Sequence, residues 1–194
     1  MLKIVYFLLL ALVILIFYTG CGNDESSDDQ PSISANSEVN LIGTWNLISY
    51  KGNTLPFIAY EIGTKKVNFT SEKMIFNDNG TFTNEQTTAI QDYEDKPMVT
   101  TFKGTYTIVN KDTLTTQLTE IIYTIPDEIK EFYKSVGIDI DKETGEGQID
   151  KESYEPNITT FDLSDDILTV FVPVKDGTGK ENLETYIYKK VKNQ

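Results

Sequence analysis

The side chains that most often perform catalysis are scarce in this chain of 194 residues. It contains no His and a single Cys, and all 17 of its basic residues are Lys. Without His there is no ordinary general base and no His-ligated metal. One Cys can form neither an intramolecular disulfide nor a Cys-rich zinc site, and without Arg there is no bidentate clamp for phosphate. We therefore expect a protein that is not an enzyme and that has no cofactor.

Carboxylates, in contrast, are abundant: the chain has 30 acidic residues and a net charge of −13. This charge argues against nucleic acid as a partner, because phosphates need a basic face. Among so many acids some close pair of the kind found in glycosidases is inevitable, but no spacing selects two of them. A hydrolase is therefore the least favoured of three functional hypotheses.

The acidic segment 138–156 invites a comparison with calcium loops, because hard cations prefer clustered carboxylates. An EF-hand register that starts at Asp139 places acids at several ligand positions. It also places Thr144 where the turn needs Gly, and Glu146 where a hydrophobic residue belongs. We predict an acidic, solvated loop and no metal site, and calcium titration would test this.

The lone Cys follows a segment typical of export. Lys3 precedes fifteen uncharged residues, 4–18, which is fewer than the ~20 needed for a membrane-spanning helix. Thr19-Gly20-Cys21 resembles a bacterial lipobox. The resemblance implies a signal peptide at 1–20, cleavage before Cys21, diacylglycerol on its thiol and a fatty chain such as palmitate on its amine. A free or buried thiol, or an uncleaved anchor helix, are the alternatives.

Residues 21–40 are polar and acidic after the Cys, so they cannot bury enough apolar surface to fold alone. We predict a disordered tether between a membrane and a folded domain at 41–194. Its acids, such as Asp24 and Glu25, resemble the sorting signal of surface lipoproteins in one Gram-negative phylum. The expected location is the Gram-negative envelope at the outer membrane, on either its surface or its periplasmic face.

Period-two alternation dominates from Leu41 onward, which predicts antiparallel β-structure. Turn sequences at 77–80, 110–112, 164–166 and 176–179 are short enough to join consecutive hairpins. The predicted strands are 42–51, 65–76, 81–91, 98–109, 113–124, 158–164, 167–174 and 184–192. One short helix is predicted after Pro126, with an apolar stripe of Ile129, Phe132, Tyr133 and Val136, and with Gly137 at its end.

Several motifs in this region resemble bacterial lipocalin-like domain lipoproteins of the calycin superfamily. They are Gly43-Thr44-Trp45, Phe76 with Gly80-Thr81-Phe82, Gly104-Thr105-Tyr106, and 188–191. The resemblance implies an eight-stranded antiparallel up-and-down β-barrel with room for one small apolar ligand. It further implies that Gly43 bends the first strand and that Trp45 plugs the closed end, where Lys190 replaces the usual Arg.

Two roles are open for the many aromatic side chains. They can fill the barrel, or some can line a ligand site, for which the candidates are Phe82, Phe102, Tyr106, Phe171 and Tyr186. Our leading hypothesis is a lipid-anchored envelope lipoprotein that binds a small hydrophobic ligand. The alternative is a protein-interaction module with a filled barrel, working through the 138–156 segment or the helix. A pocket above ~300 Å³ would favour the first. The sequence determines neither a ligand nor an oligomeric state.

Overall fold

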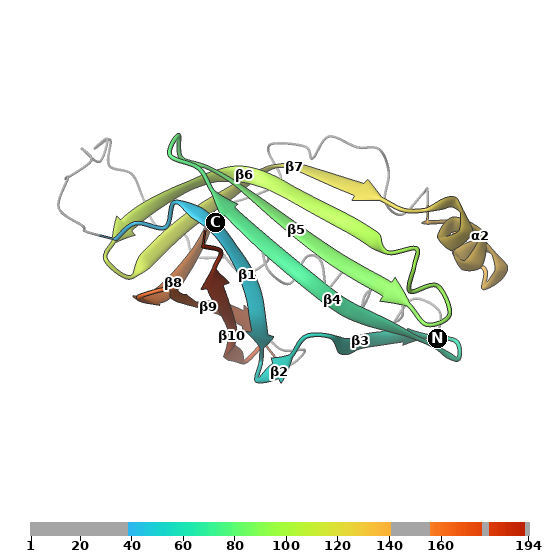
Figure 1. The fold of residues 1–194 in the computed structure, drawn as a ribbon. Helices are drawn as coiled ribbons and strands as arrows, with labels where there is room; N and C mark the ends of the chain where they lie inside the picture. The colour runs from blue at the N-terminus through green and yellow to red at the C-terminus, as the bar shows by residue number, and fades with distance from the viewer. Residues whose placement is uncertain (1–38, 141–155, 176–178, 193–194) are drawn as a thin grey trace.

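The computed structural model describes residues 39–140, 156–175 and 179–192. Within these ranges the chain forms ten strands and one short helix (Figure 1). The predicted signal segment, Cys21 and nearly all of the predicted tether lie outside the described residues.

Eight strands form a closed antiparallel barrel. They are β1 (Gly43–Tyr50), β4 (Lys65–Phe76), β5 (Thr81–Ile90), β6 (Met98–Asn110), β7 (Thr113–Thr124), β8 (Asn157–Ser164), β9 (Ile167–Lys175) and β10 (Glu181–Lys190). Each strand from β4 to β10 pairs with the next, and β10 pairs with β1. The barrel closes where β1 also pairs with β4, with Gly43 opposite Phe76 and Trp45 opposite Met74. This confirms the predicted all-β, eight-stranded up-and-down architecture.

The alternating strands are joined by turns whose residues suit them. In the β4–β5 hairpin Gly80 has φ +77°, a region that favours glycine. Asn77 Nδ2 donates to Thr81 Oγ1 at 3.0 Å, and the Thr81 amide donates to Asn79 Oδ1 at 3.1 Å. These local bonds fix the register of a hairpin that the sequence predicts, because the Asn side chains and the positive φ of Gly80 determine the turn.

Two strands outside the barrel were not expected. β2 (Asn53–Thr54) pairs with β1, and β3 (Phe57–Ile62) pairs with β4. A two-residue strand is too short to show a period of two, and Pro56 interrupts the pattern between them. The last barrel strand also begins at Glu181, three residues before the predicted 184.

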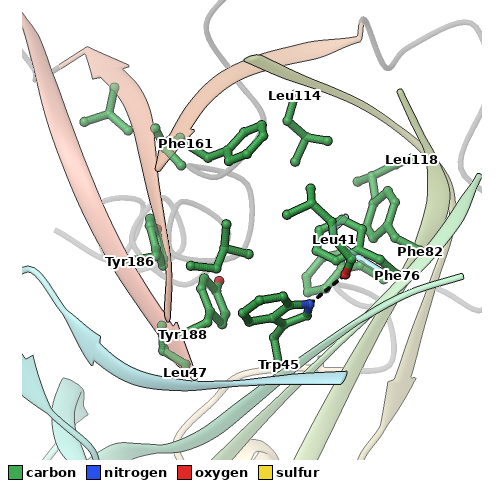
Figure 2. Close-up of a cluster of buried hydrophobic side chains, with 14 of the residues drawn as sticks. Leu41, Trp45, Leu47, Phe76, Phe82, Leu114, Leu118, Phe161, Tyr186 and Tyr188 are labelled. Carbon is green, nitrogen blue, oxygen red and sulfur yellow. Dashed lines mark hydrogen bonds between the residues drawn. The ribbon is translucent and has the colours of Figure 1, made fainter. Parts of the chain in front are cut away.

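The barrel interior is filled largely by aromatic and aliphatic side chains from alternate strand positions. Trp45 and Phe102 are almost completely buried there, together with Phe76, Phe82 and Phe161. Figure 2 shows these rings, apart from Phe102, entering the interior from different strands, with the Trp45 indole close to Leu41. On the first strand, Trp45 and Leu47 both face this interior, two positions apart.

The predicted helix is present as α2 (Asp127–Ser135). Its Ile129 and Tyr133 are fully buried, and they pack on a second cluster that includes Val67 and Ile90. α2 lies beside the ends of β5 and β7 (Figure 1). Nine residues are too few for a stable isolated helix, so this docking maintains it. Val136, predicted to complete the stripe, is 42% exposed because the helix ends before it.

Candidate ligand-binding site

A cavity of about 60 Å³ lies inside the barrel. Its apolar wall comes from β9, where Leu168, Val170 and Val172 point inward at alternate positions, and from Phe76 and Phe82 at the β4–β5 hairpin. The period of two in each strand produces this wall, since inward residues alternate with outward ones. The volume is well below the ~300 Å³ of a site for a drug-sized ligand.

A second, smaller cavity of about 30 Å³ adjoins the first. Leu47, Phe57 and Phe69 contribute its apolar side chains. Glu72 and Tyr186 line both cavities, so these two side chains stand between the two spaces.

Glu72 is the one residue with a carboxyl side chain among those lining the larger cavity, and it is 3% exposed. Tyr188 Oη donates to Glu72 Oε1 at 2.6 Å, and Asn84 Nδ2 donates to the same oxygen at 2.5 Å. Gln86 Nε2 donates to Oε2 at 3.4 Å. Burial raises the pKa of Glu72 above its ordinary value, against the opposing effect of these three hydrogen bonds.

Asn84 is 4% exposed and also lines the larger cavity. Its Oδ1 atom is buried without a hydrogen-bond partner, and it is the sole such side-chain atom found over the described residues. A buried acceptor without a donor costs free energy. Two residues that line the cavity thus carry an unsatisfied acceptor and a buried carboxyl.

A second buried carboxyl, that of Glu184, has a different environment. Tyr50 Oη donates to Glu184 Oε2 at 2.6 Å, Tyr186 Oη donates to it at 3.2 Å, and Lys51 forms an ion pair with Oε1. Burial raises the pKa of the Tyr50 hydroxyl, and the bond to Glu184 adds to this. Glu184 is thus compensated by a cation.

The five predicted ligand-lining aromatics separate into two groups. Phe82 and Tyr186 line the larger cavity. Phe102 is buried in the core, Tyr106 packs edge-on against Phe76 with ring centroids 4.9 Å apart, and Phe171 is half-buried on β9, in the alternation opposite Val170 and Val172. Phe102, Tyr106 and Phe171 line neither cavity.

The three residues assigned to the closed end lie together. Lys190 Nζ is 5.1 Å from the centroid of the Trp45 ring, and Trp45 Nε1 donates to the Leu41 carbonyl at 2.8 Å. Gly43 has φ +131°, and a Cβ there would lie 3.0 Å from Lys190 Cε. The absence of a side chain at Gly43 thus makes room for the lysine over the indole.

Glu72, Asn84 and Gln86 were not among the predicted ligand-lining residues. The alternation of their strands could have identified them, because Asn84 and Gln86 share a strand face with inward-pointing Phe82. Their polarity makes an interior position unexpected, although the period of two places them inside.

Other predicted features have little structural description. Cys21 and most of the acidic segment 138–156 lie outside the described residues. In the described ranges, no group of three or more metal-ligating side chains lies together. Across those same ranges, no helix has the length and apolar character needed to cross a bilayer.

Comparisons with known proteins assign no family to the chain. The chain matches no protein-family model, and no curated protein matches its sequence.

Proposed function

We propose that this protein is a non-enzymatic envelope lipoprotein, anchored by lipid at Cys21, whose barrel holds a small molecule. The supporting observation is the cavity of about 60 Å³ inside the barrel, which is walled mainly by apolar side chains. Native interiors are close-packed, so an apolar space next to buried polar groups is a place for an occupant. The resemblance to lipocalin-like lipoproteins supports the same role.

Native mass spectrometry of the full chain, purified from its own envelope, tests this function. A reproducible bound mass is expected. The Val170→Phe variant should abolish that mass, because the larger side chain points into the cavity. Thr169→Phe is the matched control, since it adds the same ring to the neighbouring outward position of β9. No bound mass in the unmodified protein, or equal retention in both variants, would contradict ligand binding in this cavity.

A protein-interaction module is the second candidate, and a specific surface feature favours it. Ile158 on β8 is 61% exposed and Leu183 on β10 is 67% exposed. These strands flank β9, so both side chains lie on one wall of the barrel exterior. Exposed apolar groups gathered on one face are typical of contact surfaces.

Photo-crosslinking in cells distinguishes this second function. A crosslinker placed at Leu183 should capture one reproducible protein, whereas one placed at Lys103, on β6, should not. The absence of a specific product at Leu183, together with a bound small molecule in the barrel, would exclude the interaction module.

A further inference from the structure

The polar side chains at the larger cavity have more hydrogen-bond acceptor capacity than donors to fill it. The hydroxyl of Tyr188 and the amides of Asn84 and Gln86 all donate to Glu72. Oε1 accepts two short bonds, and Oε2 accepts one long bond of 3.4 Å. A carboxylate oxygen can accept more than this. Oε2 therefore retains acceptor capacity beside the cavity.

Asn84 Oδ1 adds a second acceptor at the same place. The nitrogen of the same amide, Nδ2, is 2.5 Å from Glu72 Oε1. This contact fixes the orientation of the amide, because a carboxylate attracts the NH₂ group and repels the amide oxygen. Oδ1 is left buried and unpartnered, on a residue that lines the cavity. An occupant that satisfies both acceptors must supply hydrogen-bond donors.

The charge of Glu72 indicates which donors. In the described parts of the chain, Glu72 forms no ion pair with a lysine, whereas Glu184, which is also buried, is paired with Lys51. Its three hydrogen-bond partners are neutral, and burial raises its pKa although these bonds oppose the rise. A cationic donor would provide the compensation that Glu184 receives from its lysine.

We propose that the barrel cavity binds a small organic ammonium, with its N–H groups donating to Glu72 and to Asn84 Oδ1 and its alkyl part against Val170 and Leu168. The proposal rests on the ligand-binding function above and adds the chemical class of the ligand. A cavity of about 60 Å³ has room for about four to six water-sized groups, at about 10–15 Å³ each, which restricts the alkyl part to a short chain. The net charge of −13 raises the local concentration of cations around the protein.

Calorimetric titration of the full chain with n-propylammonium chloride and with 1-propanol tests the proposal. The two probes have the same length, and only the ammonium has a charge. Propylammonium should bind more tightly than propanol. Glu72→Gln, which keeps the shape of the side chain, should weaken propylammonium binding about tenfold or more and leave propanol binding unchanged.

Two further variants make the test specific. Asn84→Ala removes the free acceptor and should also weaken propylammonium binding, which provides a result if Glu72→Gln does not fold. Glu85→Gln is the matched control, because Glu85 lies on the outward face of β5 in an exposed ion pair with Lys73. It should leave both affinities unchanged.

The outcomes separate the two proposals. Equal binding of both probes, unaffected by Glu72→Gln and Asn84→Ala, would overturn the ammonium assignment and leave ligand binding standing. Binding of propanol alone would have the same meaning. If neither probe binds and native mass spectrometry finds no bound mass, both proposals fail.

Discussion

The buried carboxyl of Glu72 should control how stability depends on pH. Its pKa is raised by burial from an ordinary value of 4.5, so the folded state holds this proton more tightly than the unfolded chain does. The stabilisation is fully present below about pH 4.5 and is lost as the pH rises through the folded-state pKa. The titratable group in direct contact is Tyr188, whose own pKa is raised well above its ordinary value by burial, then by the charge of Glu72.

Glu72→Gln should remove this pH dependence. We expect its free energy of unfolding to rise relative to that of the unmodified protein as the pH increases from about 4 to about 8, because the amide never ionises. Urea unfolding at several pH values measures this. Glu85→Gln, which removes an exposed carboxyl from the same sheet region, should follow the unmodified protein. Parallel profiles for the unmodified protein and Glu72→Gln would show that the carboxyl is not desolvated as described.

At Gly104, β6 lies very close to both of its neighbouring strands. A Cβ at this position would lie 2.2 Å from the backbone carbonyl oxygen of Gln117 on β7 and 2.6 Å from Cε1 of Phe82 on β5. Neither neighbour can yield without moving a strand or pushing Phe82 into the cavity. Gly104→Ala should therefore lower the free energy of unfolding by about 1–3 kcal/mol.

Thr105→Ala is the control for this substitution, because Thr105 is exposed on the next position of β6. It should change stability by less than about 0.5 kcal/mol. Urea unfolding of the two variants gives the comparison. Equal stability of Gly104→Ala and the unmodified protein would mean that β6 and β7 can separate at this point without cost.

At the level of elements, local chemistry made most of the barrel predictable. Strands such as 65–76 and 113–124 agree with their observed limits, because Asn-Gly and Asp-rich turns end them sharply. The helix was predictable from its apolar stripe. β2 and β3 were not, because they pair by extending the sheet past the barrel closure, a tertiary arrangement with little local pattern.

The candidate site was predictable only in part, for a related reason. Phe82 and Tyr186 were identified as interior aromatics, since hydrophobic residues on an inward face are expected inside. Glu72 and Asn84 are polar side chains that are nevertheless buried. Hydrogen bonds between β4, β5 and β10 stabilise them inside the barrel. Such cross-strand bonds depend on register, which a single strand does not reveal.

For the whole molecule, net charge and anchoring act together. A net charge of −13 keeps the protein repelled from anionic lipid surfaces. Electrostatic attraction would therefore not produce the proposed membrane association, which the proposed lipid at Cys21 would have to supply. Two or more acyl chains are enough for stable anchoring.

Cys21→Ala should therefore abolish anchoring without affecting the barrel. In a Gram-negative host fed a clickable palmitate analogue, we expect the unmodified protein to be labelled and to sediment with membranes. The variant should be unlabelled, since no other Cys is present. Ser27→Ala, a change in the predicted tether, should retain both label and location. The thermal stability of the domain should be equal in all three proteins, because the described barrel begins beyond these positions. Persistent labelling of Cys21→Ala would end the lipoprotein proposal while leaving the ligand proposals to their own tests.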